Sequence, residues 1–194
     1  MPTGPGGLDA NGVWQYGEDD TEALASDLLN LGMASVSDVV AGITVLQVVS
    51  VTKTDTATTS SQTFANVAGL TASITPVSTS SKIFILVNAA FATNGATSVI
   101  YARLARDGTA IAIGDAAGDR PRTSIEVYGA SSQYAPGAMS FEDSPASTAT
   151  IVYSLQWRAQ LVSPVYINRT SSDSDSVTGR SRAISTITVW EVAG

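Results

Sequence analysis

The residue types that most often carry chemistry are scarce in this chain. It contains no histidine and no cysteine, which removes the commonest general base near neutral pH, the thiol nucleophile and the usual zinc ligands. The groups that remain are carboxylates in three close pairs, Asp115/Asp119, Glu142/Asp143 and Asp173/Asp175. A glycosidase needs two such groups facing each other across its substrate, and each pair here falls in an expected turn. We therefore predict that the protein is not an enzyme and has no catalytic residue.

Metal and cofactor sites have no recognisable pattern either. The run Ser172–Ser176 offers carboxylate and hydroxyl oxygens, but it lacks the glycine and the distal glutamate of a calcium loop. The glycines of the chain punctuate expected turns and form no phosphate-binding loop. We predict no metal and no cofactor.

The charge of the protein is concentrated near its N-terminus. Residues 1–52 hold seven acidic residues and no lysine or arginine, and the ten acids that follow are balanced by ten bases, so this segment accounts for the whole net charge of −7. Such an acidic leader can simply be solvated, or it can dock on a basic surface. Neither role suits a phosphate backbone as partner, so we predict no binding to nucleic acid.

Charged residues are rare in the chain as a whole. Hydrophobic residues make up 44% of it and charged residues only 14%, and lysine occurs only at Lys53 and Lys82. So little charge predicts that part of the surface is buried between subunits. No apolar run approaches the roughly 20 residues that span a bilayer, and no signal-like segment opens the chain. We expect no membrane insertion and a protein that starts in a cytoplasm.

Residues 1–42 are predicted to form an attachment segment. Glycine and proline in the first eleven residues favour an extended arm. A helix is expected over residues 20–31, because Asp19 and Glu22 can form its capping box and Gly32 can end it. Its leucines follow i, i+4, i+7 spacing and need an apolar surface, either the protein's own β domain or another protein. The residues predicted to attach the segment are Trp14, Tyr16, Leu24, Leu28 and Leu31.

Residues 43–194 have the pattern of an all-β domain. Runs of valine, isoleucine, threonine and aromatic residues are divided by turn residues at short intervals, which is typical of an antiparallel sandwich or barrel. We predict a jelly-roll-like antiparallel β-sandwich, preceded by the extended arm and one short N-terminal helix. Strands are expected over residues 43–52, 57–66, 70–75, 82–91, 98–106, 109–114, 122–128, 137–142, 148–160, 164–168 and 183–192. Asp107-Gly108 predicts a tight hairpin, because both residues tolerate positive φ.

Two of these strands predict where a core and an interface lie. In 148–160, one face is made by Ile151, Tyr153, Leu155, Trp157 and Ala159, which predicts a single buried side. In 82–91 both faces are apolar, as in a strand that lies between a core and a subunit interface. The residues predicted at that trimer interface are Phe84, Leu86 and Asn88. We expect Trp157 and Trp190 in the core, because both lie in alternating strands.

Two long polar loops are expected on the surface, Gly129–Gly137 and Asn168–Arg182. Exposed loops on a rigid scaffold are common recognition sites. The residues predicted to bind a receptor there are Gln133, Tyr134, Asp173 and Asp175.

The leader resembles the N-terminal segments of a known class of virion proteins. Its matching stretches are Gly12-Val-Trp-Gln-Tyr-Gly-Glu-Asp-Asp20, Ser26-Asp-Leu-Leu-Asn-Leu-Gly32 and Ser35-Val-Ser-Asp38. They resemble minor tail and fibre proteins of tailed bacteriophages, particularly those that infect actinobacteria.

The rest of the chain is similar to a β domain that recurs in phage structural proteins. The matching stretches are Gly69-Leu-Thr-Ala-Ser-Ile-Thr-Pro76 with Ser80-Ser-Lys-Ile83, Arg103-Leu-Ala-Arg-Asp-Gly108 with Ile113-Gly-Asp115, Asp143-Ser-Pro145, Tyr166-Ile-Asn-Arg169, and Ser185-Thr-Ile-Thr-Val189 with Glu191. The resemblance implies a virion structural protein, assembled in the bacterial host cytoplasm, that is commonly a homotrimer.

The expected role is therefore a trimeric short tail fibre or minor tail protein. Residues 1–42 would attach to other virion proteins, and the β domain would face outward with a host-surface glycan as its candidate receptor. Two alternatives stay open: a capsid decoration or head-fibre protein, and a free lectin-like carbohydrate-binding module. The acidic leader argues against the free module, which has no need of one.

Overall fold

The computed structural model describes residues 7–8, 14–15, 44–95, 98–128, 133–176 and 180–194. The chain divides into two compact units, Met1–Thr44 and Val45–Gly194. In the first unit, β1 (Gly7–Leu8) pairs antiparallel with β2 (Trp14–Gln15). This short hairpin was not expected from the arm's glycine and proline content. The predicted helix over 20–31, and with it Tyr16, Leu24, Leu28 and Leu31, lies outside the described residues.

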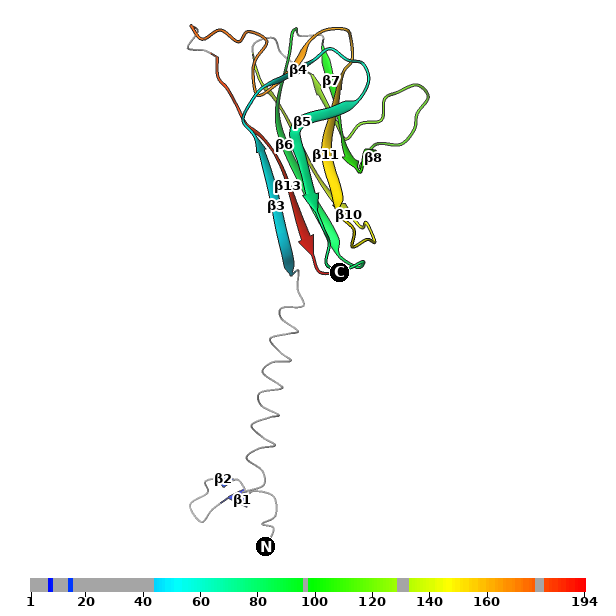
Figure 1. The fold of residues 1–194 in the computed structure, drawn as a ribbon, viewed down its shortest axis with the longest axis vertical. Coiled ribbons are helices and arrows are strands. Elements are labelled where there is room, and N and C mark those ends of the chain that lie inside the picture. The colour runs from blue at the N-terminus through cyan, green and yellow to red at the C-terminus, as the bar shows by residue number, and fades with distance from the viewer. Residues whose placement is uncertain (1–6, 9–13, 16–43, 96–97, 129–132, 177–179) are drawn as a thin grey trace. The chain divides into compact units, whose positions relative to one another are not determined.

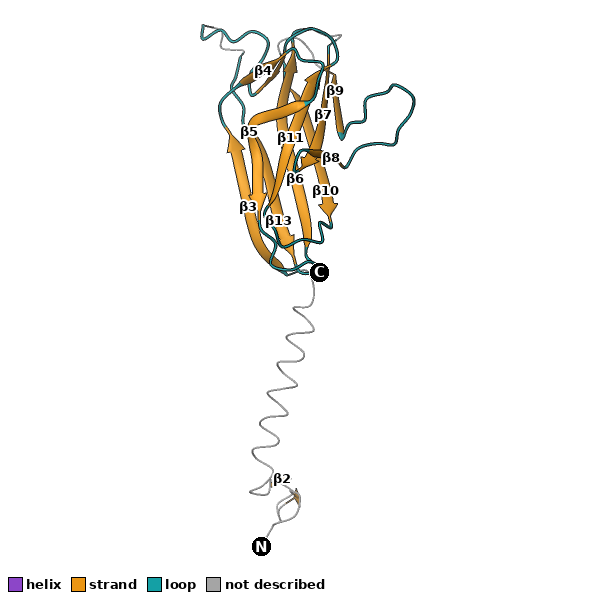
Figure 2. Ribbon diagram, turned by 45° about the vertical axis from the view of Figure 1, so that its right-hand side comes forward, coloured by secondary structure: helices purple, strands orange, loops and turns teal. Residues whose placement is uncertain are grey.

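The second unit is all-β, and every element described in it is a strand of an antiparallel pair (Figure 1). The strands are β3 (Val45–Lys53), β4 (Ala57–Thr59), β5 (Ala65–Ile74), β6 (Lys82–Thr93), β7 (Val99–Arg106), β8 (Thr109–Ile111), β9 (Ile125–Tyr128), β10 (Ala135–Asp143), β11 (Ile151–Ala159), β12 (Val165–Ile167) and β13 (Ser185–Val192). They form two sheets that pack into a β-sandwich, with most strands running along its length (Figure 2).

The first sheet is centred on β6. On one edge β6 pairs with β10, and on the other it pairs with β13, which pairs in turn with β3. Phe91 pairs with both Ala135 of β10 and Ile167 of β12, so those two strands lie on opposite edges of β6. Strand β12 therefore continues the line of β13, and β4 beside it continues the line of β3.

The second sheet has the order β5-β11-β7, and both β8 and β9 pair with the far edge of β7. The hairpin predicted at Asp107-Gly108 is confirmed. It joins β7 to β8, with Arg106 opposite Thr109 and φ of 49° and 81° at the two central residues. Positive φ at both positions matches the right-handed twist of the flanking strands.

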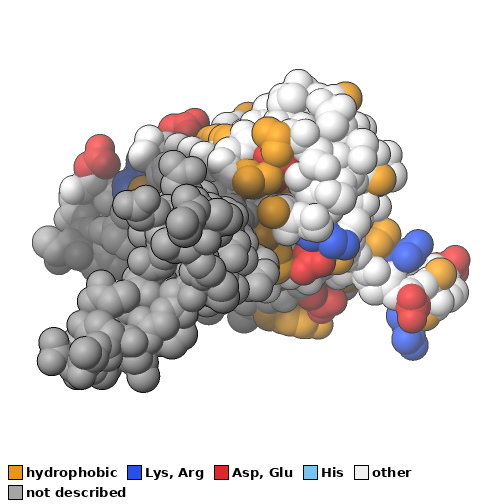
Figure 3. Space-filling view, turned by 90° about the horizontal axis from the view of Figure 1, so that it is seen from below, with side chains coloured by type: hydrophobic (Ala, Val, Ile, Leu, Met, Phe, Trp, Pro, Cys, Tyr) orange, Lys and Arg blue, Asp and Glu red, His pale blue; other side chains and the backbone are white. Residues whose placement is uncertain are grey.

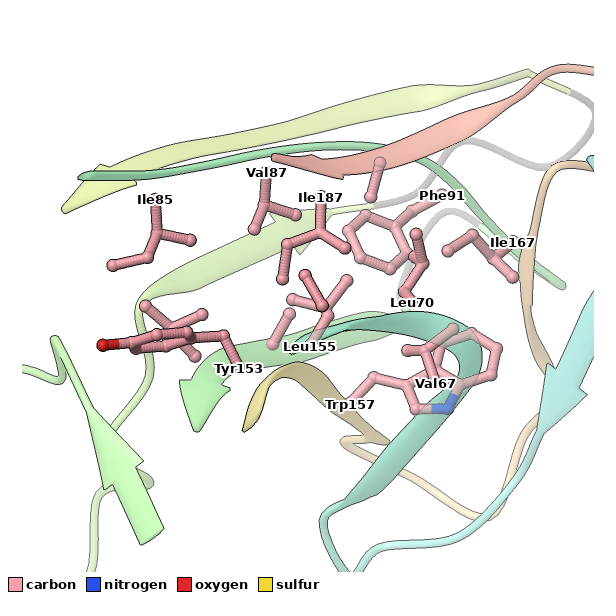
Figure 4. Packing of buried hydrophobic residues seen from close by; sticks show 14 of the residues in the cluster. Val67, Leu70, Ile85, Val87, Phe91, Tyr153, Leu155, Trp157, Ile167 and Ile187 are labelled. Carbon is pink, nitrogen blue, oxygen red and sulfur yellow. The ribbon is translucent and has the colours of Figure 1, made fainter. Parts of the chain in front are cut away.

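The core lies between the two sheets and is built by alternation. From one sheet Ile85, Val87, Phe91 and Ile187 point toward Tyr153, Leu155 and Trp157 of the other, as Figure 4 shows. The predicted inner face of β11 is confirmed, because all five of its residues are buried, but the strand is not buried on a single side as expected, since Ser154 and Gln156 of the other face are buried as well. Trp157 packs near Phe91 with ring centroids 6.4 Å apart. Burying side chains of this size contributes about 1.5–3 kcal/mol each.

A polar tie also joins the sheets. Arg106 Nη1 of β7 donates to both carboxylate oxygens of Asp143 in β10, at 2.9 Å each, and the Tyr153 hydroxyl of β11 donates to Asp143 at 2.7 Å. Burial, together with the neighbouring Asp143 carboxylate, raises the pKa of Tyr153, so its hydroxyl stays a donor. The tie fixes the lower ends of the sheets against each other.

Asn168 closes the other end of the sandwich. Its side chain is fully buried, and its Nδ2 donates to the carbonyls of Lys53 at 2.8 Å and Asp55 at 3.0 Å. Its Oδ1 accepts from the Ser185 hydroxyl at 2.6 Å. The residue has a φ of 61°, a conformation that asparagine tolerates better than most residues. One amide therefore ties the segment between β3 and β4 to the start of β13.

Glu191 does the same for the loop between β5 and β6. Its carboxylate is fully buried and accepts from the Ser81 hydroxyl at 2.7 Å, from the Val77 amide at 2.7 Å and from the Gln47 side chain. Burial alone would raise the pKa of Glu191, but these donors outweigh it and lower the pKa below its ordinary value. The charge is thus held by neutral donors.

Three local expectations are wrong. The strands expected over 57–66 and 70–75 are instead β4 and the longer β5, because Gly69, with a φ of 81°, makes an irregularity inside β5 where a turn was expected. The loop expected over 129–137 is shorter at its end, since Ala135–Gly137 belong to β10. β10 lies at the sheet edge, where Pro136 is tolerated.

The third concerns Trp190, which was expected in the core. The inward positions of β13 are Ile187, Val189 and Glu191, so period-two alternation puts Trp190 on the outer face, where it is half-buried. The expectation failed because a glutamate with enough donors occupies the inward position next to it.

Candidate functional site

The outer face of the first sheet carries almost no charge. Its outward residues lie in β3, β13, β6 and β10, and we call them the uncharged face: Leu46, Val48, Ser50, Thr52, Thr186, Thr188, Trp190, Phe84, Leu86, Asn88, Ala90, Pro136, Ala138 and Ser140. Lys82 and Glu142, whose charged atoms are 4.0 Å apart, are the outward charges of these four strands, and both lie at their lower end.

Strand register sets the apolar residues of this face side by side. Val48 lies opposite Trp190, and Trp190 lies opposite Phe84, so the three form a row across β3, β13 and β6. Val48 is 52% exposed and Phe84 38% exposed. Seen from below in Figure 3, hydrophobic side chains gather in patches on the described part of the surface, next to uncharged and charged ones. A row of exposed apolar side chains on a flat sheet is typical of a surface that meets a partner.

The structure brings together all three residues predicted at the trimer interface. Phe84, Leu86 and Asn88 are successive outward residues of β6, with Leu86 half-buried and Asn88 exposed. Their inward neighbours, Ile83 to Phe91 in alternation, are buried in the core. The interface itself stays a prediction, because one chain is described.

The predicted receptor loops lie next to each other. The Tyr134 hydroxyl donates to the Ser181 carbonyl at 2.6 Å, which joins the two loops, and burial raises the pKa of Tyr134. Asp173 is held by Arg182, with bonds of 2.9 and 2.8 Å from its guanidinium, and by Arg169 at 3.5 Å. Gln133 and Asp175 are exposed. Asp173 therefore supports the loop, and its carboxylate is already occupied.

A small hollow of about 210 Å³ lies where these loops meet the uncharged face. Its lining includes Asn88 of β6, Tyr134, Gly137 of β10 and Ile184. The structure thus places one predicted interface residue and one predicted receptor residue at the same spot. Trp14 lies in β2 of the other unit.

Of the carboxylate pairs found in the sequence, Glu142 and Asp143 do not face each other. Asp143 is committed to Arg106 and Tyr153, whereas Glu142 points to the opposite side of β10. Within the described ranges, no group of three or more acidic side chains could hold a metal ion, and no helix there has the length and apolar character to cross a bilayer.

The outer face of the second sheet carries a feature that the sequence reasoning missed. A hollow of about 580 Å³, open to solvent, is lined by Arg103 of β7, Arg158 of β11 and Arg122 of the loop between β8 and β9, with Phe64 at its base. We call it the arginine hollow. The loop that forms one wall projects from the side of the sandwich (Figure 1). Asp119 of that loop is the one acid in the lining.

Aromatic rings and amides hold the two sheet arginines in place. The Arg103 guanidinium lies 4.0 Å from the centre of the Phe64 ring, and its Nε donates to Gln156 at 2.8 Å. Arg158 lies 4.8 Å from the centre of the Tyr101 ring, and its Nη1 donates to the Gln62 carbonyl at 2.8 Å. Burial lowers the pKa of Arg103, and the nearby charge of Arg158 lowers it further.

A signal for this site was present in the sequence. Arg103 and Arg158 both occupy outward positions of expected strands, but the two strands are separated by many residues. The pairing of β7 with β11, which puts Arg103 opposite Gln156 and Tyr101 opposite Arg158, brings them together. Only knowledge of that pairing would have identified the hollow.

Comparisons with known proteins add no family to this description. No protein-family model matches the chain, and no curated protein sequence matches it significantly.

Proposed function

We propose that this protein is a structural bacteriophage virion protein, a homotrimeric short tail fibre or minor tail protein whose β domain faces outward and binds a host receptor. The observation that carries the proposal is the uncharged face. A monomeric surface is normally studded with charges of both signs, whereas the outward residues of these four strands carry charge only at Lys82 and at Glu142, which lies opposite Phe84 at the lower end of the face.

We propose in addition that the β-sandwich is a jelly roll, which would support the same role. The pairings β3-β13-β6-β10 in one sheet and β5-β11-β7-β9 in the other support this proposal, because two interlocked Greek keys give such an order. Jelly rolls of this kind recur in viral capsid and lectin domains. The fold alone does not determine function, so the proposal rests on the chemistry of the two outer sheet surfaces.

The uncharged face has the composition of a subunit interface. Cores of such interfaces are depleted in charged residues and enriched in aromatic ones, and Trp190 and Phe84 lie side by side on this face. Serine and threonine fill the rest, and they can form hydrogen bonds across an interface without the cost of burying an ion. Three copies related by a closed rotation would cover this face completely.

The acidic leader supports attachment to a virion. Residues 1–44 contain seven acidic and no basic residues and so hold the whole net charge of −7, and the second compact unit begins after them, at Val45. A terminal acidic segment on a nearly neutral domain is suited to docking on a basic partner surface through residues 1–42.

Light scattering after size-exclusion chromatography tests the assembly. The full chain should elute with about three times its monomer mass of 19.9 kDa. A clean monomer at micromolar concentration would refute the trimer.

Removal of residues 1–40 tests the attachment. The β domain should stay folded and trimeric but should no longer join virions. Unaltered incorporation of the truncated chain would show that the leader does not dock, and a virion location on the head would favour the decoration role over the tail fibre.

A further inference from the structure

We infer that the arginine hollow binds the carboxylate of an acidic saccharide, with Arg103 and Arg122 as the groups that grip the anion. The site lies on the outer face of the second sheet, away from the predicted receptor loops at Tyr134 and Asp173. The inference rests on the proposed receptor-binding role of the domain and names the chemistry of the ligand.

The charges of Arg103 and Arg158 are not balanced by ion pairs within the described residues. Arg106, Arg169 and Arg182 each reach a carboxylate. Among the described residues, no carboxylate forms an ion pair with Arg103 or Arg158, although the two guanidiniums are close enough for one charge to disfavour the other. The lining holds three arginines and one acid, Asp119, so the hollow is positive on balance and attracts an anion. A bound carboxylate would relieve the repulsion between the two guanidiniums.

Free donors are the second argument. Arg103 and Arg122 each use Nε for a protein acceptor, the Gln156 side chain and the Gly114 carbonyl respectively. Their terminal nitrogens donate to no protein acceptor in the described part of the chain. A guanidinium with two free terminal nitrogens matches the two oxygens of a carboxylate.

A buried donor without a partner strengthens this point. Nε of Arg158 is buried and forms no hydrogen bond with the protein. Such orphaned donors are rare in folded proteins, because leaving one unpaired costs about 1–3 kcal/mol. Arg158 lines the hollow, so its guanidinium adds a third positive charge to the site.

Rigidity is the third argument. Phe64 and Gln156 fix the plane of Arg103, and Gln156 is fixed in turn by a hydrogen bond of 3.1 Å to Asn66. Tyr101 supports Arg158 from the strand side. Arginines that are already ordered lose little conformational entropy when a ligand binds.

The size and lining of the hollow point to a sugar instead of a lone ion. A volume of about 580 Å³ is far larger than a carboxylate group needs. Around the arginines the wall offers the side-chain carbonyl of Gln62, the hydroxyl of Thr63 and the apolar ring of Pro121. Hydroxyl and amide partners next to a ring face suit the mixed polar and apolar surface of a saccharide.

The test uses trigalacturonate and its methyl ester, which differ only in whether the carboxylates are charged. Calorimetric titration of the full chain should show binding of trigalacturonate that is at least about tenfold tighter than that of the ester. Equal binding of the two, or no binding of trigalacturonate at millimolar concentration, overturns the inference. If acetate or inorganic phosphate binds as tightly as trigalacturonate, the inference that the ligand is a saccharide is wrong.

Two neighbouring arginines give a matched pair of variants. Arg122→Gln should weaken binding of trigalacturonate about tenfold, whereas Arg120→Gln, which makes the same charge change outside the hollow, should change it less than about twofold. Arg103→Gln should abolish detectable binding, with near-ultraviolet circular dichroism as the check on folding. If the variants at positions 122 and 120 weaken trigalacturonate binding equally, the binding reflects general charge attraction, and the hollow is not a specific site.

The inference and the proposed function fail separately. If the protein is a stable trimer that does not bind trigalacturonate, the hollow is not a saccharide site, and the proposed virion role is unaffected. A monomer that binds trigalacturonate through Arg122 refutes the trimer and leaves the hollow standing.

Discussion

On the outer surface of β3, β13, β6 and β10, threonine, serine and apolar side chains follow one another, whereas the outer surface of β5, β11 and β7 holds Arg103 and Arg158 against aromatic rings. Both surfaces cover the same core, and both arise from the same alternation of inward and outward residues. The inward residues are constrained by packing, so the outward residues are free to differ between the sheets.

The difference indicates a division of tasks between the two sheets. A surface without charges can be buried against a copy of itself at little desolvation cost, while a surface with unpaired arginines stays in water until an anion arrives. The first sheet is suited to assembly and the second to recognition. Four predictions test this comparison, in order of decreasing effect.

The largest effect is expected from a charge placed on the uncharged face. Phe84→Asp should turn the trimer into a monomer, because each interface would bury an unpaired carboxylate at a cost of about 3 kcal/mol or more, over a hundredfold in association. Ser73→Asp, at an exposed outward position of β5, is the matched control and should leave the mass unchanged. Sedimentation equilibrium measures the mass of both variants. If Phe84→Asp is still a trimer, the uncharged face is not the subunit interface.

Both surfaces lie on the same sandwich, so loss of the Asn168 hydrogen bonds should lower the stability of the whole domain. Asn168→Ala leaves the Lys53 and Asp55 carbonyls without their side-chain donor and puts alanine at a φ of 61°, so we expect a loss of about 3 kcal/mol in unfolding free energy. Asn66→Ala, at an exposed asparagine of β5, should cost about 1 kcal/mol or less. Urea denaturation measures both, and equal effects would contradict the role given to Asn168.

Acid should weaken the first sheet through Glu191. Its pKa is lowered in the folded protein from an ordinary value of 4.5, so the stability it contributes is fully present above about pH 5 and is lost as the pH falls through the folded pKa, below 4.5. Glu191→Gln turns an amide toward three donors and should cost about 2 kcal/mol at pH 7. Thermal unfolding should show this difference shrinking between about pH 5 and pH 3, and a constant difference would contradict the assignment.

The smallest effect is expected in the predicted receptor loop. Arg182→Gln breaks the ion pair between Arg182 and Asp173. The Arg182 side chain is 55% exposed, and exposed ion pairs contribute only about 0–1 kcal/mol to the free energy of unfolding. The unfolding free energy, the trimer mass and the binding of trigalacturonate should all stay within error. A clear loss of trigalacturonate binding would move recognition from the arginine hollow to this loop.

Local features of the fold were predictable from the sequence because they depend on neighbours. The inner face of β11 and the hairpin at Asp107-Gly108 both follow from residue type and spacing, and both are confirmed. Gly69 was read as a turn, but its positive φ serves equally well inside a strand. A single glycine does not tell the two apart.

Features that depend on distant pairing could not be predicted. Trp190 joins Val48 and Phe84 only through the register of β13 with β3 and β6. Glu191 can be buried only because Gln47, Val77 and Ser81 come together around it. The arginine hollow likewise needs β7 beside β11. In each case the residues were visible in the sequence, and the contact that gives them a role was not.

The pairing of Val45 with Val192 places the start of β3 and the end of β13 at the same end of the sandwich. A pull on Val45 directed along β3 therefore loads every hydrogen bond between β3 and β13 at the same time, in shear, because these bonds lie across the strands. A pull across the sheet would instead peel them apart one by one. The domain should thus unfold slowly when tension is applied at Val45 along β3 and the opposite end of the sandwich is held.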